Sequence, residues 1–336
     1  MKTGRGFIGI GILAIGAIVA LRIVALAGAS NAPSQLGSET LCRTYTGIPD
    51  RWPADPEAGM VHVPAGEFIL GSNSGFADER PSGNAKVKVR GFWIDRSEVT
   101  NAQFARFVRA TAYASDAERQ GGGAVFHMPS EQELRTRDLA WWTYVRGASW
   151  RHPLGPGSDI SGKENQPVTL VTQADALAYA RWLGRDLPTE AEWEYAGEGG
   201  RDTVDPDAPP RDSDGKATAN YWQGVFPVLD TAEDGHAGLA PVGCYPGNGF
   251  RLHDMIGNAW EWTKDIHTGP HQPHTNGDTA AVAPPSRLHN ISMVIKGGSF
   301  LCSSNYCMRY RASSRERQEA DLPAAHIGFR TVLRTQ

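Results

Sequence analysis

The stretch "LPTEAEWEYAG", residues 187–197, carries a helix start, an amphipathic pattern and a glycine stop in direct succession. Thr189 is followed three residues later by Glu192, which is the pattern of a capping box, where each side chain bonds to the other's backbone amide. Apolar residues then recur at a spacing of three and four, and we expect the helix to end at Gly197. The stretch therefore predicts a short helix that buries one face against a core.

Two other segments begin with the same capping signal. Thr100 precedes "NAQFARFV" and has Gln103 as its capping partner, while Thr172 precedes "QADALAYARWLG" and has Asp175 in that role. Gly184 marks the expected end of the second of these helices. Each segment repeats apolar residues at helical spacing, so each is predicted to pack one face on the same core.

The remaining segments indicate strands and loops. Residues 58–72 ("AGMVHVPAGEFILGS") and 86–95 ("KVKVRGFWID") alternate apolar and polar side chains, which predicts strands. Residues 110–170 and 198–250 are punctuated by Gly, Pro, Asp and Asn, which predicts loops with short strands. The chain has 336 residues with 38 glycines, 22 prolines and 10 tryptophans, a composition typical of a loop-rich globular domain. We expect one compact α+β domain.

The N-terminus is separate in character. Lys2 and Arg5 precede an apolar run that extends over residues 6–29 and ends among small residues, as in a secretory signal. As a helix, this run is long enough to cross a bilayer. We therefore expect residues 1–30 to be a signal peptide or membrane anchor, residues 31–57 a polar lead-in, and residues 58–336 the main domain. The protein is expected to be exported, periplasmic or otherwise extracytoplasmic, and to touch a membrane only through this segment.

The overall charge gives no reason to expect a nucleic-acid partner. The formal net charge is −4, and no block of basic residues stands out after the N-terminus. We expect a monomer.

The cysteines leave two interpretations open. Only four are present, and Cys302 and Cys307 lie together in "GGSFLCSSNYCMRYR", residues 297–311. In an oxidising compartment such a pair is ordinarily a disulfide. Two thiolates also suit soft, two-coordinate Cu(I), and the paired glycines that precede them permit close backbone approach. Cys42 and Cys244 either pair with each other or remain free.

Four blocks of sequence together resemble the formylglycine-generating enzyme (sulfatase-modifying factor) family, in its bacterial form, over residues 43–333. They are "MVHVPAGEFILGS" with "FWIDRSEVTNAQFARFV", "GASWRHPLGP", "RDLPTEAEWEYAG" with "DMIGNAWEWTKD", and "KGGSFLCSSNYCMRYR" with the closing "IGFR". Blocks such as "LPTEAEWEYA" and "GNAWEW" are shared by the wider superfamily. They imply a C-type-lectin-like α+β fold with little regular secondary structure. "GASWRHPLGP" and the cysteine pair are narrower and resemble the oxidases themselves.

The resemblance implies a copper-dependent oxidase. It would use O2 to convert the cysteine of a Cys-x-Pro-x-Arg motif in a sulfatase chain to Cα-formylglycine. Cys302 and Cys307 would be the catalytic Cu(I) ligands, with Ser299 as an active-site serine. The predicted substrate-binding residues are Trp150, Arg151, His152 and Tyr306. Family members often have histidine directly after the first cysteine, whereas this chain has Ser303.

The resemblance also implies structural Ca²⁺ at two places, because a fold with little regular structure must satisfy many carbonyl oxygens. The first site would take side-chain ligands from Asn220 and Asp234 and main-chain oxygens from Tyr221 and His236. The second site would take carboxylates and carbonyls from Asp254, Gly257, Ala259 and Glu261. A pair of solvated acidic loops is the simpler alternative for both.

Two other functions fit parts of the sequence. A non-catalytic C-type-lectin-like binding module uses the same scaffold but has no need of Cys302 and Cys307. A non-haem-iron sulfoxide synthase needs a histidine triad from an additional helical domain, and the chain has no room for one before residue 58.

Overall fold

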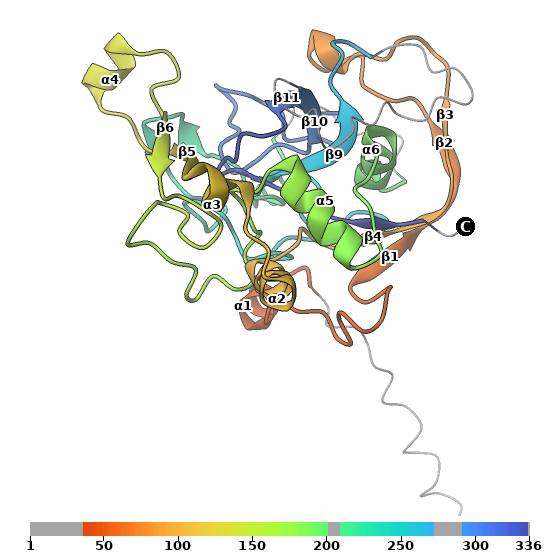
Figure 1. Cartoon of the computed structure of the whole chain (residues 1–336). Coiled ribbons are helices and arrows are strands. Elements are labelled where there is room, and N and C mark those ends of the chain that lie inside the picture. Colours follow the sequence, from red (N-terminus) through yellow and green to blue (C-terminus); the bar gives the residue numbers. More distant parts are fainter. Residues whose placement is uncertain (1–35, 201–208, 272–290, 335–336) are drawn as a thin grey trace, which may run out of the picture. The chain divides into compact units, whose positions relative to one another are not determined.

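The computed structural model describes residues 36–200, 209–271 and 291–334 (Figure 1). These residues belong to one compact unit that runs from Leu36 to Gln336. The predicted signal peptide or anchor, residues 1–30, lies outside the described residues. Among the helices that are described, none is both long and apolar enough to cross a membrane.

Helices are short and distributed along the chain. They are α1 (Glu39–Thr44), the 3-10 turn η1 (Ala77–Glu79), α2 (Asn101–Thr111), α3 (Asp116–Gln120), α4 (Glu131–Thr136), α5 (Gln173–Trp182) and α6 (Glu190–Glu198). The predicted capping boxes at Thr100, Thr172 and Thr189 are all present. Sequence reasoning missed α1, α3 and α4 because each is only one or two turns long and shows no apolar periodicity.

The predicted end of α6 is wrong by two residues. Gly197 lies inside the helix, and the left-handed residue that terminates it is Gly199, with φ 63°. A Cβ on Gly197 would lie 3.1 Å from the Trp193 ring and 3.2 Å from the Ala312 methyl. Gly197 is therefore small for packing reasons, while Gly199 supplies the backbone conformation that a helix stop needs.

Strands form small sheets. A four-stranded sheet has the order β11-β10-β9-β12, a three-stranded sheet has the order β1-β4-β13, and β2–β3, β5–β6 and β7–β8 are two-stranded. Their bounds are β1 (Met60–Val63), β2 (Gly66–Phe68), β3 (Val87–Val89), β4 (Phe92–Asp95), β5 (Gly122–Phe126), β6 (Trp142–Arg146), β7 (Gly224–Val225), β8 (Leu229–Asp230), β9 (Trp260–Ile266), β10 (Ser292–Lys296), β11 (Arg315–Glu319), β12 (Ile327–Gly328) and β13 (Val332–Leu333).

Both predicted β segments form strands, but neither is continuous. Residues 58–72 contain β1 and β2, and residues 86–95 contain β3 and β4 in different sheets. Arg90 and Gly91 separate the second pair. A local alternation pattern predicts extended backbone but does not say which neighbour each strand will pair with.

The core lies between the four-stranded sheet and the helices α5 and α6, which pack against β9 and β10 (Figure 1). It is rich in aromatic residues, and Trp150, Trp193 and Trp262 are among its largest fully buried side chains. It also holds buried ion pairs, including Arg330 with Glu261 at 2.6 Å and Lys296 with Glu194 at 2.6 Å. These pairs position the segments that surround the cavity described below.

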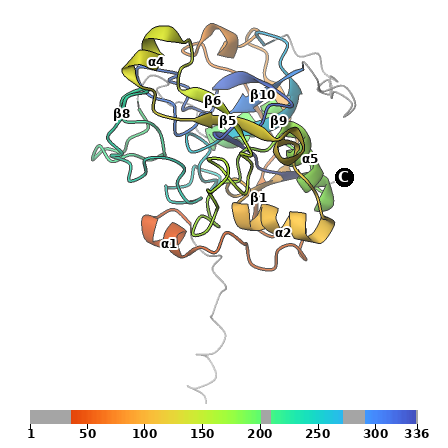
Figure 2. The same cartoon turned by 60° about the vertical axis from the view of Figure 1, so that its left-hand side comes forward.

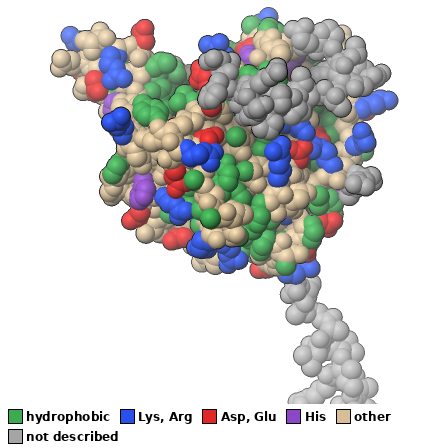
Figure 3. All heavy atoms as spheres, in the orientation of Figure 1, with side chains coloured by type: hydrophobic (Ala, Val, Ile, Leu, Met, Phe, Trp, Pro, Cys, Tyr) green, Lys and Arg blue, Asp and Glu red, His purple; other side chains and the backbone are tan. Residues whose placement is uncertain are grey.

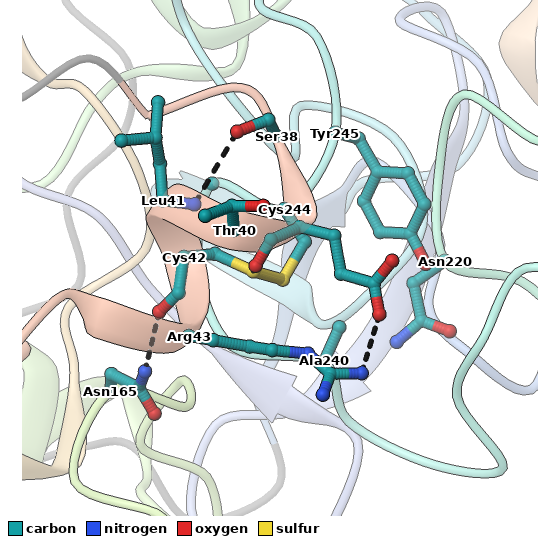
Figure 4. The surroundings of a disulfide bond; sticks show 12 residues. Ser38, Thr40, Leu41, Cys42, Arg43, Asn165, Asn220, Ala240, Cys244 and Tyr245 are labelled. Carbon is teal, nitrogen blue, oxygen red and sulfur yellow. Dashed lines mark hydrogen bonds and ion pairs between the residues drawn. A yellow bond between two sulfur atoms is a disulfide. The ribbon is translucent and has the colours of Figure 1, made fainter.

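Residues 36–57 of the predicted lead-in pack onto the rest of the unit. Cys42 in α1 forms a disulfide with Cys244, with Cα atoms 4.9 Å apart (Figure 4). The Asn165 side-chain amide donates a 2.7 Å hydrogen bond to the Cys42 carbonyl. The open question about Cys42 and Cys244 is therefore answered: they pair, and α1 is covalently part of the folded unit.

Candidate active site

The loop that follows β10 carries the cysteine pair, and two glycines let it begin. Gly297 and Gly298 have φ of 94° and 81°. A Cβ on Gly298 would lie 2.3 Å from the Arg309 carbonyl oxygen, so the two arms of the loop touch backbone to backbone. The close approach expected from the sequence is confirmed, since only glycine fits both the conformation and the contact.

The loop folds back so that Cys302 and Cys307 meet. The Ser303 amide donates to the Tyr306 carbonyl at 2.8 Å, which makes a tight turn between the cysteines. The Cα atoms of Cys302 and Cys307 are 5.1 Å apart, and the structure joins their sulfurs. Cys302 is buried, whereas Cys307 is partly exposed. The sequence prediction that these side chains converge is confirmed, and their arrangement suits either a disulfide or a shared ion.

Both cysteines line a cavity of about 380 Å³. Its walls are mostly aromatic, with an ionic edge formed by Arg309 and Glu316. The full lining is Phe76, Trp141, Trp142, Phe226, Trp260, Ser299, Leu301, Cys302, Tyr306, Cys307, Arg309, Glu316 and His326. A cavity of this size and character accommodates a few side chains of a peptide rather than a large folded partner.

Two predicted site residues, Ser299 and Tyr306, lie in this cavity. Ser299 is buried, and its Oγ accepts a 3.3 Å hydrogen bond from the Leu301 amide. The Tyr306 ring stacks on Phe226 with centroids 4.3 Å apart. Ser299 therefore has a fixed position beside the thiols, and Tyr306 is part of the wall.

The β5–β6 and β7–β8 hairpins lie on the same side of the molecule (Figure 2), and residues of both hairpin regions line the cavity. Trp141, just before β6, contacts Phe226, in the turn between β7 and β8, with ring centroids 5.3 Å apart. Trp141 also contacts Tyr306 at 5.2 Å. The segments come from three separate parts of the chain, which is why no sequence motif predicted this wall.

Ser303, which replaces a common histidine, is directed into the loop. Its hydroxyl donates to the Asn305 side-chain oxygen Oδ1 at 2.7 Å, and Asn305 Oδ1 also accepts from the Phe226 backbone amide at 3.1 Å. Ser303 does not line the cavity. Its role in the structure is to fix the turn, and it cannot act on a bound molecule from this position.

Trp150, which was predicted to bind the substrate, is not among the residues that line the cavity. Trp150 is 1% exposed and packs in the core against Phe104, with ring centroids 5.2 Å apart. Arg151 stacks over the Trp150 ring and pairs with Glu118 at 3.0 Å. The His152 Nδ1 atom lies 2.6 Å from the Ser158 carbonyl oxygen. None of Trp150, Arg151 and His152 lines the cavity, because this loop uses them to hold its own shape.

Sequence reasoning missed His326, which lies just before β12. It lines the cavity, and its ring is 4.6 Å from that of Trp142. Its buried Nδ1 has no hydrogen-bond partner among the described residues. Burial lowers the pKa of His326 to about 3, so the imidazole is neutral at physiological pH. A single histidine outside any motif gave no signal that could have identified it.

The second predicted calcium region holds more buried negative charge than its cation balances. Glu98, Asp254 and Glu261 are all buried, and Arg330 is bound to Glu261 through both carboxylate oxygens. Glu98 Oε2 and Asp254 Oδ1 have no hydrogen-bond donor from the described residues. Burial, followed by the neighbouring carboxylates Asp254 and Glu261, raises the pKa of Glu98 well above its usual value. Glu98 was not among the predicted ligands.

In the first predicted calcium region, the protein supplies hydrogen-bond donors to most of the side-chain oxygens. Asp234 accepts from the amides of Tyr221 and His236 at 3.0 Å each. Asn220 Nδ2 donates to the Asn258 side-chain oxygen at 2.9 Å. The Oδ1 atom of Asn220 is buried and has no hydrogen-bond donor in the described structure. The structure brings the four predicted residues into one loop cluster and offers one free side-chain oxygen there.

Asn258 connects the two regions. Besides the bond from Asn220, it donates to Glu98 Oε1 at 3.0 Å. Gly257 and Ala259, which were predicted to offer carbonyl oxygens, flank Asn258 in the turn that precedes β9. Within the described ranges, no three His, Cys, Asp or Glu side chains form a ready metal-binding group, so a cation here would also require main-chain oxygens.

Two adjoining cysteines that line an aromatic cavity, on an α+β fold with small sheets, define a narrow class of protein. The Sulfatase-modifying factor enzyme 1-like domain matches residues 46–335. The chain therefore belongs to the formylglycine-generating enzyme (sulfatase-modifying factor) family, as the sequence resemblance predicted.

Individual relatives agree with this assignment. The chain is 42% identical over 294 residues to a formylglycine-generating enzyme of Thermomonospora curvata, covering 84% of this chain and 96% of the relative. It is 35% identical over 287 residues to an inactive Cα-formylglycine-generating enzyme 2 of Mus musculus, covering 82% and 85%. The solved structure of PvdO from Pseudomonas aeruginosa matches with a TM-score of 0.56 at 23% identity, covering 82% of this chain and 94% of PvdO. The expected C-type-lectin-like fold is confirmed.

Proposed function

We propose that this protein is an active formylglycine-generating enzyme, which oxidises the cysteine of a Cys-x-Pro-x-Arg motif in a sulfatase chain with copper and O2. The observation that carries the proposal is the convergence of Cys302 and Cys307 on the floor of an accessible, aromatic-walled cavity. A binding module would have no use for two thiols at that place. The relatives that bear the enzyme's name support the same reaction.

The donor set fits Cu(I). When reduced, Cys302 and Cys307 offer two soft thiolates, which favour Cu(I) over hard cations. The described cavity contains no other cysteine, so a third soft ligand would come from the substrate. When bound, copper would supply the activation of dioxygen that the oxidation needs.

The protein's own side chains prepare the site for a peptide. The aromatic walls offer apolar surface to the substrate and restrict water around the thiols. The buried Ser299 hydroxyl is available for hydrogen bonding close to the cysteine pair. His326 contributes a neutral ring, because burial lowers its pKa to about 3.

A peptide assay tests the proposal. Purified protein, reduced and loaded with copper, is incubated with O2 and a Cys-x-Pro-x-Arg peptide, and the peptide is followed by mass spectrometry. We expect the cysteine to be converted to formylglycine, and we expect Cys302→Ser and Cys307→Ser to abolish the conversion. Ser304→Ala is a matched control because Ser304 is exposed on the same loop between the two cysteines. An unchanged peptide that nevertheless binds would favour the non-catalytic module, and one relative of this chain is an inactive member of the family.

We also propose that Ca²⁺ binds in the region of Glu98, Asp254 and Glu261. The unpartnered oxygens of Glu98 and Asp254 support this, since a buried carboxylate without a donor is unfavourable unless it is protonated or meets a cation. A second ion near Asn220 and Asp234 is supported only by the one free Asn220 oxygen.

A further inference from the structure

The two walls of the cavity differ in chemistry. Trp141, Phe226 and Tyr306 pack together as one apolar wall, with ring centroids between 4.3 and 5.3 Å apart. Arg309 and Glu316 are the charged residues among those that line the cavity. Glu316 is the single carboxylate among the lining residues, and its side chain is 43% exposed.

Arg309 is already occupied by other carboxylates. Its Nη1 lies 3.0 Å from Asp78 Oδ2 and 3.0 Å from Glu79 Oε1, and its Nη2 donates to Asp78 Oδ1 at 3.2 Å. Its contact with Glu316 is a single, longer approach of 3.5 Å through Nε. Glu316 is thus only weakly neutralised by Arg309.

The neighbouring arginines form their ion pairs with carboxylates other than Glu316. Arg311 pairs with Glu79, and Arg315 pairs with Glu190 at 2.7 Å. Arg317 follows Glu316 in β11 and its side chain alternates to the other face, so only its backbone amide contacts Glu316, at 3.0 Å. Arg315 Nη1 also donates to the Asp78 carbonyl at 3.1 Å, so it is engaged on that side of the cluster. Among the described residues, the ion pair of Glu316 is therefore the 3.5 Å approach of Arg309.

We propose that Glu316 binds the cationic side chain of the peptide substrate, the arginine of the Cys-x-Pro-x-Arg motif, and thereby determines specificity. This rests on the proposed function, which supplies the peptide. The Glu316 carboxylate is half-exposed and has one weak ion pair, with Arg309. Replacing that pair by two hydrogen bonds from the guanidinium of the substrate would therefore cost little interaction energy and gain a charged, bidentate contact. The aromatic wall of the same cavity would receive the apolar part of the motif.

Glu316→Gln tests this, with Glu319→Gln as the matched control. Glu319 is exposed on the same strand, and its removal changes the net charge equally, but it does not line the cavity. Binding is measured by tryptophan fluorescence with two peptides in which serine replaces the target cysteine. One peptide keeps the arginine, and the other has neutral citrulline in its place. Kinetics with the corresponding cysteine peptides give a second readout.

Wild-type protein and Glu319→Gln should bind the arginine peptide about fivefold to thirtyfold more tightly than the citrulline peptide. Glu316→Gln should lose that preference, Glu316→Asp should partly restore it, and added salt should reduce it in the wild type. The inference is overturned if Glu316→Gln keeps the wild-type preference, if Glu319→Gln loses it equally, or if the wild type has none.

The two proposals fail separately. Wild-type protein that prefers the arginine peptide but never converts its cysteine would contradict the enzymatic function and leave Glu316 as the recognition residue. Normal conversion, together with an arginine preference that does not depend on residue 316, would contradict only the inference about Glu316.

Discussion

His326 illustrates how a single, partly buried side chain couples the cavity to stability. Its Nδ1 has no partner in the described structure, and burial lowers its pKa to about 3. In the unfolded chain, histidine titrates near 6.5. Between these values the unfolded state binds the proton and the folded state does not, so folding becomes less favourable as the pH falls below 6.5.

We predict that His326→Asn makes stability less dependent on pH. At pH 5 the wild-type histidine should lower the free energy of unfolding by up to about 2 kcal/mol relative to pH 7. Urea unfolding of both proteins at pH 5 and pH 7 gives this difference directly. Titrations elsewhere, such as that of Asp265, whose pKa burial raises to about 7, are common to both proteins and cancel. Equal pH dependence in the two proteins would show that His326 is protonated in the folded state.

For single residues, the sequence indicated which side chains belong to the cysteine loop better than it indicated where residues outside that loop would lie. Cys302, Cys307, Ser299 and Tyr306 all line one cavity, because they lie in one short loop whose residues stay close whatever the rest of the fold does. Trp150 lies in the core, and the sequence could not indicate this, because an aromatic residue in a motif suits a core and a groove equally well.

Among the elements, the loop between β10 and β11 depends most on its backbone. Gly298 adopts φ 81° and lies against the Arg309 carbonyl, which holds the two ends of the loop together around Ser299 and the cysteine pair. A side chain at this position would separate those ends.

We predict that Gly298→Ala destabilises the protein more than the backbone conformation alone explains. Gly162→Ala is the matched control, because Gly162 has φ 74° but open space around its Cβ position. The control should cost about 1 kcal/mol of unfolding free energy and Gly298→Ala about 2–4 kcal/mol. Equal losses in a thermal or urea titration would mean that the loop relaxes without cost.

Helix starts were predictable because a capping box is local, and all three proposed boxes are present. Strand partners were not, since β4 pairs with β1 and with β13 at the far end of the chain. The aromatic wall of the cavity was unpredictable for the same reason, because its residues come from segments that are distant in sequence.

For the whole molecule, the buried carboxylates Glu98, Asp254 and Glu261 connect the N-terminal half of the domain to the C-terminal half. Their charge is only partly balanced by Arg330. A bound Ca²⁺ ion would therefore act on the stability of the entire domain.

We predict that a calcium chelator lowers the melting temperature of the wild-type protein by several degrees. Glu98→Gln should bind less Ca²⁺ by native mass spectrometry. It should also melt higher than the wild type once chelator is present, because it removes one uncompensated buried charge. If the chelator changes neither protein, the excess charge is neutralised by protons instead.

The described part of the face in Figure 3 carries a mixture of acidic, basic and apolar side chains with no continuous basic area. The amino-acid composition predicted a loop-rich domain. It could not predict that Glu98 and Asp254 lie close together in the folded structure. Both residues lie in blocks that resemble the family, but the blocks are far apart in the chain, and no local pattern indicates that the two carboxylates meet.

The Cys42–Cys244 bridge has a practical consequence for anyone preparing a shortened version of this protein. Starting the chain at residue 58, where the first alternating strand pattern begins, would discard α1 and leave Cys244 as a reactive thiol. That thiol would be free to exchange with Cys302 or Cys307, or to join two molecules, during purification. Trimming should therefore stop ahead of Leu36, and the host should secrete the product or otherwise permit oxidation.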